Sequence, residues 1–190
     1  MASNKHEEIA QAAIRLFEKK GYHATSVQDI ADEVGLQKGS LYHYISSKED
    51  LLMQITHQAI NGFNRNLEKI MNLQLPVREK FILAFESHLN SLTSNMSMAI
   101  VLLREAFSLG EHQHSVIQQA TDQYLDLWCR ILDEGLASGE FHHTNSRLTA
   151  LSILGSLNWV YRWYDSNKRL SPNELAREFA NIFLRGIERR

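Results

Sequence analysis

The chain has 190 residues, 44% of them hydrophobic, and a formal net charge of −2, so it can hold one large or two small domains with a substantial core. No apolar run approaches the ~20 residues that a membrane helix needs, and the first residues, MASNKHEE, lack the apolar segment of a signal peptide. A single cysteine, Cys129, excludes an intrachain disulfide and suits a reducing compartment. We therefore expect a cytoplasmic protein without a membrane partner.

Apolar residues recur at helical spacing along the chain and no segment alternates as a strand does, so an all-α fold of about nine helices is predicted. The first helix is expected over residues 5–20, and Gly21 closes it. Ser26 is a good N-cap for the second helix, and Asp29 stands where it completes a capping box. Gly35 can adopt the left-handed conformation that ends this helix.

A third helix is predicted over residues 37–45, after a turn of about four residues. Leu41, Tyr44 and Ile45 share its inner face, which leaves short and hydrogen-bonding side chains outside. A recognition helix contacts base edges with residues near its N-terminus. Serine capping boxes then start the next helix at once, with Lys48 at its beginning. The segment therefore reads as a helix-turn-helix that runs directly into a further helix.

Three stretches of this region, LFEKKGYHATSV, DIADEVGLQKGSLYHYI and SSKEDLL, resemble the N-terminal DNA-binding domain of the TetR family of bacterial transcriptional regulators. The resemblance is dense from Ile9 to Leu52 and extends further only in length and helical layout; Ile45 replaces the Phe of many relatives. It implies an N-terminal DNA-binding domain at 1–50 and a C-terminal ligand-binding and dimerisation bundle at 51–190. The residues expected to contact DNA are Thr25, Ser26, Gln37, Lys38, Gly39, Ser40, Tyr42, His43 and Lys48.

The predicted DNA-binding domain is not basic, although DNA-binding surfaces usually are. Residues 1–50 contain six Lys or Arg against eight Asp or Glu. Positions 34–48 contain no acid, however, and there Lys38 and Lys48 flank the proposed recognition helix. We expect modest nonspecific affinity, acids that point away from DNA or cap helices, and phosphate contacts made partly by hydroxyls and helix N-termini. The alternative, an ordinary three-helix packing unit, would not require these outward polar side chains.

Helical patterns continue to the end of the chain. Apolar residues surround the helix at 96–109, which predicts burial on nearly every side. The last helix has the clearest start, because Ser171 can act as N-cap, Pro172 is at the first helical position and Glu174 at the third. The remaining helices are predicted at 48–72, 77–92, 116 to 135 or 139, 146–165 and 172–189.

Wide apolar stripes on the last two helices predict that they pair with their copies in a four-helix interface. Glycines in both stripes would let the backbones approach closely, and a helix-turn-helix dimer reads two half-sites about 34–36 Å apart. The alternative is that the stripes only close the core of the monomer; the family resemblance favours the homodimer. The residues expected at the interface are Leu151, Leu154, Gly155, Phe179, Ile182, Phe183 and Gly186.

Trp159, Arg162 and Trp163 share a helix face, where a guanidinium could stack on an indole and bind a phosphate. A packed aromatic corner at the dimer edge, or pairing of Arg162 with Asp165 or Glu105, is an open alternative. Apolar residues facing one another across the bundle would line an adaptable hydrophobic pocket. The residues expected to bind ligand are Phe81, Phe85, Met98, Leu102, Leu103, Phe107, Tyr124, Trp128, Trp159, Arg162 and Trp163.

Within the TetR family, the NWVYRWY segment is similar to regulators of fatty-acid or sterol side-chain catabolism, whose effectors are acyl-coenzyme A thioesters. The resemblance implies a repressor that leaves a palindromic operator when an acyl-coenzyme A binds, with coenzyme phosphates near Arg162, Lys168 or Arg169. The effector would shift the helix at 48–72 and change the spacing of the two DNA-binding domains. The alternative is a regulator of drug efflux that responds to cationic or aromatic lipophilic compounds.

No catalytic or metal-binding pattern stands out in the sequence. Neither His112 with His114 nor His142 with His143 has the i, i+4 spacing or the cysteine partners of a persuasive metal site. Gly-rich phosphate loops, GxSxG elbows and paired catalytic carboxylates do not occur. We therefore expect no enzyme activity, no metal and no cofactor. A helical adaptor that binds only protein is a further alternative, but it leaves the outward residues of the recognition helix unexplained.

Overall fold

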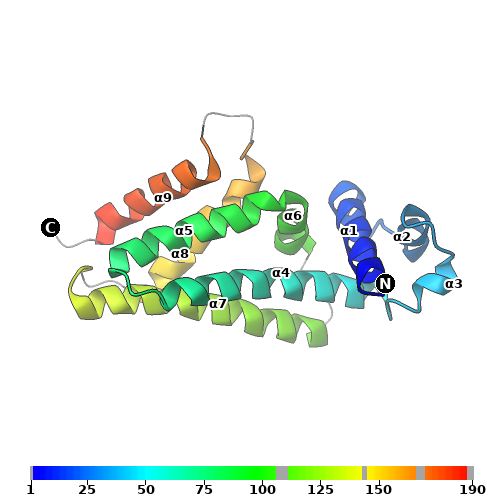
Figure 1. The fold of residues 1–190 in the computed structure, drawn as a ribbon, viewed down its shortest axis with the longest axis horizontal. Helices are drawn as coiled ribbons and strands as arrows, with labels where there is room; N and C mark the ends of the chain where they lie inside the picture. Colours follow the sequence, from blue (N-terminus) through cyan, green and yellow to red (C-terminus); the bar gives the residue numbers. More distant parts are fainter. Residues whose placement is uncertain (1, 106–110, 143–144, 166–169, 188–190) are drawn as a thin grey trace. The chain divides into compact units, whose positions relative to one another are not determined.

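The structure is a computed structural model that describes residues 2–105, 111–142, 145–165 and 170–187. Within these ranges the chain forms α-helices and one 3₁₀ helix, without a β-strand (Figure 1). The predicted all-α fold is therefore confirmed. No helix in the same ranges is long and apolar enough to cross a membrane.

The chain folds as two compact units, Met1–Ala59 with Met96–Gln119, and Ile60–Asn95 with Ala120–Arg190. The first unit holds α1 (Ala2–Lys20), α2 (Val27–Glu33), α3 (Lys38–Leu41), α6 (Met96–Glu105) and the first parts of α4 (Lys48–Met71) and α7 (Glu111–Ser138). The second holds the rest of α4 and α7 together with α5 (Val77–Ser94), α8 (Ser146–Asn158), η2 (Trp159–Arg162) and α9 (Pro172–Ile187). The long helices α4 and α7 thus contribute to both units.

Side-chain caps fix where several helices begin. Ser26 and Asp29 form the predicted capping box at the start of α2. Ser171 opens α9 in the same way, since its hydroxyl accepts the Glu174 N–H while the Glu174 carboxylate accepts the Ser171 N–H. At α4 the Ser47 hydroxyl accepts the N–H three residues further on. These starts follow from local sequence alone, because each cap satisfies a backbone N–H that the helix leaves unpaired.

Two helices are shorter than the sequence predicts. α3 is a single turn, because beyond Leu41 the backbone continues in tight turns in which the His43 N–H donates to the Ser40 carbonyl at 3.2 Å. α8 ends at Asn158, and the aromatic and β-branched run from Trp159 continues as the 3₁₀ helix η2. Such residues lose rotamer freedom in an α-helix, and 3₁₀ turns are common at helix ends.

Helix α6 is not buried on every side, which corrects the prediction for residues 96–109. It packs against α1 within the first unit. Ala99 and Val101 are buried there, whereas the other side chains of α6 are partly or fully exposed. A helix that packs mainly on one neighbour buries only one stripe. Residues 106–109 lie outside the described part of the chain.

Helix α5 packs against both α8 and α9 in the second unit. Its predicted inner stripe is buried along its whole length, with Phe81 and Phe85 fully enclosed. The Phe85 ring meets the buried Trp128 indole edge-on, with centroids 5.3 Å apart. The ring of Phe141, which follows α7, occupies the space where any side chain of Gly135 in α7 would begin. The core of this unit is therefore an interlocked aromatic cluster.

Candidate functional site

The short helix α3 and the turn after it present the predicted recognition surface. Leu41 and Ile45 are buried and anchor this segment to the first unit. Tyr42 is 48% exposed. Gln37, Lys38, Gly39 and His43 are also exposed, and Ser40 is half-buried. The division into inward apolar and outward polar residues is the one that the sequence predicts. The outward side chains are accessible to a macromolecular partner.

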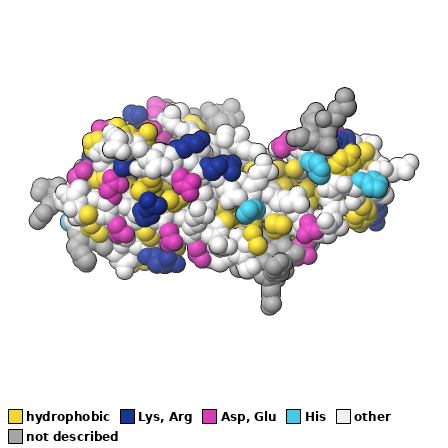
Figure 2. Space-filling model, turned by 60° about the horizontal axis from the view of Figure 1, so that its bottom comes forward, with side chains coloured by type: hydrophobic (Ala, Val, Ile, Leu, Met, Phe, Trp, Pro, Cys, Tyr) yellow, Lys and Arg dark blue, Asp and Glu magenta, His cyan; other side chains and the backbone are white. Residues whose placement is uncertain are grey.

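The acids next to this surface are engaged within the protein. Lys20 Nζ donates to the Asp29 carboxylate at 2.9 Å, and Arg15 pairs with Glu33 at 3.2 Å. Hydrogen bonds from Lys20, and then from Ser26, hold the pKa of Asp29 well below its ordinary value. On the face shown in Figure 2, the described basic and acidic side chains are interspersed. Because residues 1–50 hold six Lys or Arg against eight Asp or Glu, the candidate surface offers local polar side chains more than a broad positive field.

Lys48 has an internal role that the sequence did not reveal. Its ammonium donates to the Tyr22 carbonyl at 2.8 Å and to the Thr25 carbonyl at 2.7 Å, and it lies 4.3 Å from the centre of the Tyr22 ring. Burial lowers the pKa of Lys48, and the Asp29 carboxylate opposes this shift. The side chain thus ties the start of α4 to the turn before α2. A phosphate contact by Lys48 remains a prediction, and it would compete with these two carbonyls.

Thr25 is likewise part of the core. Its side chain is buried, and its hydroxyl lies 2.9 Å from the Gly21 carbonyl and 3.3 Å from the Leu16 carbonyl. Any contact of Thr25 with DNA would have to use the backbone or displace this hydroxyl. Ser26 is exposed, but its hydroxyl is shared with Asp29 in the capping box. Both residues position α2, and their contact with DNA stays a prediction.

The predicted ligand residues fall into separate groups. Phe81, Phe85, Tyr124 and Trp128 come together in the buried aromatic cluster of the second unit. By contrast, Trp159 is 59% exposed, and the Arg162 guanidinium lies 5.9 Å from its ring. Trp163 is exposed as well, and Met98, Leu102 and Leu103 are half-buried on α6 of the first unit. Phe107, Lys168 and Arg169 lie outside the described residues.

A buried polar group sits inside the aromatic cluster. His88 Nδ1 lies 2.9 Å from the Tyr124 hydroxyl, and both side chains are buried. Burial lowers the pKa of His88 to about 4, against the opposing effect of the Asn158 side chain. Burial also raises the pKa of Tyr124 well above its ordinary value. The one signal in the sequence was a histidine within the apolar stripe of residues 77–92, and its partner on α7 could not be read from it.

The predicted interface residues leave apolar surface uncovered. Ile182 on α9 is 63% exposed and Leu151 on α8 is 50% exposed. Gly155 and Gly186 are exposed too, while Leu154, Phe179 and Phe183 are half-buried. Leu148, not predicted at the interface, is exposed three residues before Leu151 in α8. Large exposed apolar side chains on α8 and α9, the two helices that pack on α5, are typical of surfaces that a partner covers.

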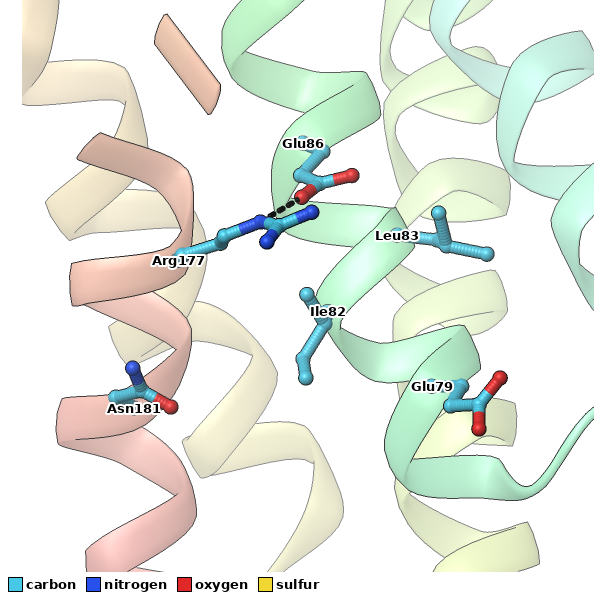
Figure 3. Close-up of a pocket in the computed structure, with 6 residues that line it drawn as sticks. All are labelled: Glu79, Ile82, Leu83, Glu86, Arg177 and Asn181. Atoms are coloured by element: carbon cyan, nitrogen blue, oxygen red, sulfur yellow. Dashed lines mark hydrogen bonds and ion pairs between the residues drawn. The ribbon is translucent and has the colours of Figure 1, made fainter. Parts of the chain in front are cut away.

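A separate groove of about 400 Å³ lies between α5 and α9 (Figure 3). Arg177 on α9 reaches across it, and its Nε donates to the Glu86 carboxylate on α5 at 2.6 Å. None of the predicted ligand residues lines this groove. The groove is therefore distinct from the aromatic cluster, and the ion pair between Arg177 and Glu86 fills part of it.

Among the described residues, no group of three His, Cys, Asp or Glu side chains could hold a metal ion.

An exposed helix-turn-helix on a helical body defines a DNA-binding protein, and known proteins share this arrangement. Residues 9–55 match the model of bacterial regulatory proteins of the tetR family, and residues 74–187 match the tetracyclin repressor-like C-terminal domain. The chain therefore belongs to the TetR family of transcriptional regulators.

Individual relatives match the chain over nearly its whole length. It is 26% identical to the transcriptional repressor KstR2 of Mycolicibacterium smegmatis, over 97% of the chain and 91% of that protein. It is also 26% identical to the fatty acid metabolism regulator protein of Bacillus subtilis, over 96% of the chain and 95% of that protein. A solved structure of AibR with isovaleryl coenzyme A and operator DNA has the same fold, with a TM-score of 0.85 at 24% identity, covering 93% and 96% of the two chains.

His88 should make folding depend on pH in a defined window. Its pKa is about 4 in the folded chain against an ordinary 6.5, so the unfolded chain binds the proton more readily and stability falls as the pH falls through this window. Between pH 7 and pH 4.5 the loss is about 2.5 kcal/mol. Urea denaturation should show this extra loss relative to His88→Gln, which cannot titrate. Equal losses in the two proteins would mean that His88 is not held neutral.

Proposed function

We propose that this protein is a homodimeric repressor that binds a palindromic operator and is released by a hydrophobic acyl-coenzyme A effector. The observation that carries the DNA-binding part is the exposed polar surface of α3 and its flanking residues, from Gln37 to His43, held on buried Leu41 and Ile45. The side chains of Tyr42 and Lys38 are exposed, so packing of this segment does not require them. Exposed polar side chains on a recognition helix are suited to contact base edges and phosphates in a major groove, which supports the proposal.

The proposed effector class rests on chemistry and on relatives. A buried cluster of large aromatic rings suits a hydrocarbon chain. The name of one relative, the fatty acid metabolism regulator protein of Bacillus subtilis, refers to lipid metabolism, and AibR has been solved with isovaleryl coenzyme A. A regulator of drug efflux remains the second candidate, since aromatic walls also suit flat lipophilic compounds. Under either candidate function, we expect the protein to act by binding DNA and a ligand and not by catalysis. We expect it to do so in the cytoplasm.

Helix α4 is the proposed element of the switch. It begins at Lys48 in the first unit and continues into the second. If the effector favours one position of α4 by its differential affinity, it changes the spacing of the two DNA-binding units in a dimer. We retain residues 1–50 as the proposed DNA-binding part and residues 51–190 as the ligand-binding and dimerisation part.

Substitutions on α3 test the DNA-binding assignment. Tyr42→Ala should weaken operator binding on the order of 10-fold, and Lys38→Ala should lower the slope of log affinity against log salt by about one. Electrophoretic mobility shifts with DNA from upstream of the protein's own gene, repeated over a salt series, measure both effects. Lys19→Ala removes an equal charge from an exposed position on α1 and serves as the matched control. Unchanged operator binding in both α3 variants would reject the assignment; Lys48 is avoided because its loss would disturb the fold.

Charges placed on the exposed apolar face test the dimer. Leu151→Glu combined with Ile182→Glu should convert the dimer to a monomer, because two buried carboxylates per chain would face their copies without partners. Light scattering coupled to gel filtration gives the mass directly. Leu73→Glu changes another exposed leucine, which lies outside α8 and α9, and it should leave the dimer intact. A dimer that survives the double substitution would place the interface elsewhere.

Release of the operator tests the effector class. Long-chain acyl-coenzyme A, added to the operator complex, should lower DNA affinity roughly 5- to 150-fold, the usual range of allosteric coupling. Coenzyme A alone and a cationic lipophilic dye serve as comparison ligands in a fluorescence-anisotropy titration. Release by the dye and not by the thioester would favour the drug-efflux regulator.

A further inference from the structure

Two lysine side chains of the first unit hold α2 at its two ends. Lys48, the first residue of α4, donates from its ammonium to the Tyr22 carbonyl at 2.8 Å and to the Thr25 carbonyl at 2.7 Å. Both carbonyls lie in the turn just before α2. Lys5 in α1 donates to the Val34 carbonyl at 3.0 Å, and Val34 is the C-cap of α2. One end of α2 is therefore fixed from α4 and the other end from α1.

Both ammoniums have partners inside the unit in place of part of their hydration, since Lys48 and Lys5 are half-buried. The Tyr22 ring, centred 4.3 Å from the Lys48 ammonium, and the two carbonyls replace water there. Val34 is at the end of α2 whose carbonyls the helix cannot pair, which favours a cation at this point. Lys5 also pairs with Glu8 on its own helix at 2.9 Å. Because Lys48 contacts two carbonyls and Lys5 only one, we expect Lys48 to hold α2 more firmly.

The position of α2 determines where the recognition surface lies. Helices α2 and α3 pack against each other, and only the turn at residues 34–37 separates them. This turn is bonded back to α2, since the Leu36 N–H donates to the Ala31 carbonyl at 2.9 Å. Helix α3 is a single turn, and so short a helix has almost no stability of its own. A displacement of α2 therefore displaces α3.

The alternative role of these lysines is a direct phosphate contact, which would compete with their carbonyls. A lysine that contacts a phosphate releases a counterion, so its loss weakens binding to every DNA sequence and lowers the salt slope by about one. A lysine that positions α2 affects binding to the operator only. Contacts with base edges need the correct placement of α3, whereas nonspecific binding rests on the phosphate backbone. The two roles therefore differ in what they do to nonspecific DNA.

We propose that Lys48 and Lys5 are positioning residues, which fix α2 between α4 and α1 and so support operator specificity without contacting DNA phosphates. This rests on the proposed function, because it assigns how the first unit presents α3 to an operator. Lys48 then acts from behind the surface, and not as the direct DNA contact that the sequence predicts. Since α4 continues into the second unit, specificity depends on where this helix begins.

Methionine substitutions test these roles, because they remove the ammonium and keep a long unbranched side chain. Full-length Lys48→Met and Lys5→Met are titrated by fluorescence anisotropy, over a salt series, with DNA from upstream of the protein's own gene and with an unrelated duplex of equal length. Loss of charged hydrogen bonds lowers the population of correctly placed α2, so operator binding should weaken about tenfold in Lys48→Met and about threefold in Lys5→Met. Binding to the unrelated duplex and the salt slope should not change.

Two further variants serve as controls. Lys19→Met removes an equal charge from an exposed position on α1 and should leave both DNA affinities unchanged. Lys38→Ala, on the recognition surface, should lower the salt slope by about one and shows that the slope is measurable. A loss of folded protein in Lys48→Met lowers both apparent affinities equally, so the ratio of the two affinities still reports the positioning role. Lys5→Met makes the smaller change and gives the same ratio if Lys48→Met does not fold.

The outcomes separate this inference from the proposed function. An equal loss of affinity for both duplexes with a lower salt slope, or unchanged operator binding in both methionine variants, would overturn the positioning role. If the native protein binds no operator, the proposed function is wrong, and hydrogen exchange of the free protein decides the structural part. Amides of residues 21–35 should exchange faster in Lys48→Met and Lys5→Met than in Lys19→Met, and equal exchange would show that neither lysine holds α2.

Discussion

The two hydrogen bonds of the Lys48 ammonium hold the start of α4 against the turn before α2, and the position of the candidate DNA-binding surface depends on them. The ammonium joins the first residue of α4 to the Tyr22 and Thr25 carbonyls, immediately before α2. A partly buried ammonium gives up hydration, so it is favourable only while these acceptors remain in place. A movement at the start of α4 must therefore move the turn that leads into the helix-turn-helix, or break both hydrogen bonds. Since α4 continues into the second unit, this contact joins the turn before α2 to a helix that belongs to both units.

The two units use polar groups in opposite ways. In the first, acids next to the recognition surface are paired with Lys20 and Arg15, which leaves Lys38 and neutral hydrogen-bonding side chains to face outward. In the second, His88 and Tyr124 are withdrawn from water and hold no charge. Short-range hydrogen bonds therefore set the environment of these polar groups in both units.

The sequence predicted those features that depend only on interactions between residues close together in the chain. The Ser26 and Ser171 boxes and the inward stripe of α5 needed only neighbouring residues, and the structure contains them. Contacts between distant segments could not be read in this way. Lys48 looked like an exposed cation, yet its partners lie 23 and 26 residues earlier; His88 looked like one member of a stripe, yet Tyr124 is 36 residues later. The candidate site was therefore predictable as a surface on α3, and the polar group of the second unit was not.

The shortness of α3 has a consequence for how such a protein can diversify. A helix of four residues has almost no stability of its own, so two buried side chains, Leu41 and Ile45, hold it in place. Its exposed positions carry little of the folding energy and can be exchanged at small cost. Under the proposed function, substitutions at these positions would alter which DNA sequence is read while the scaffold stays the same.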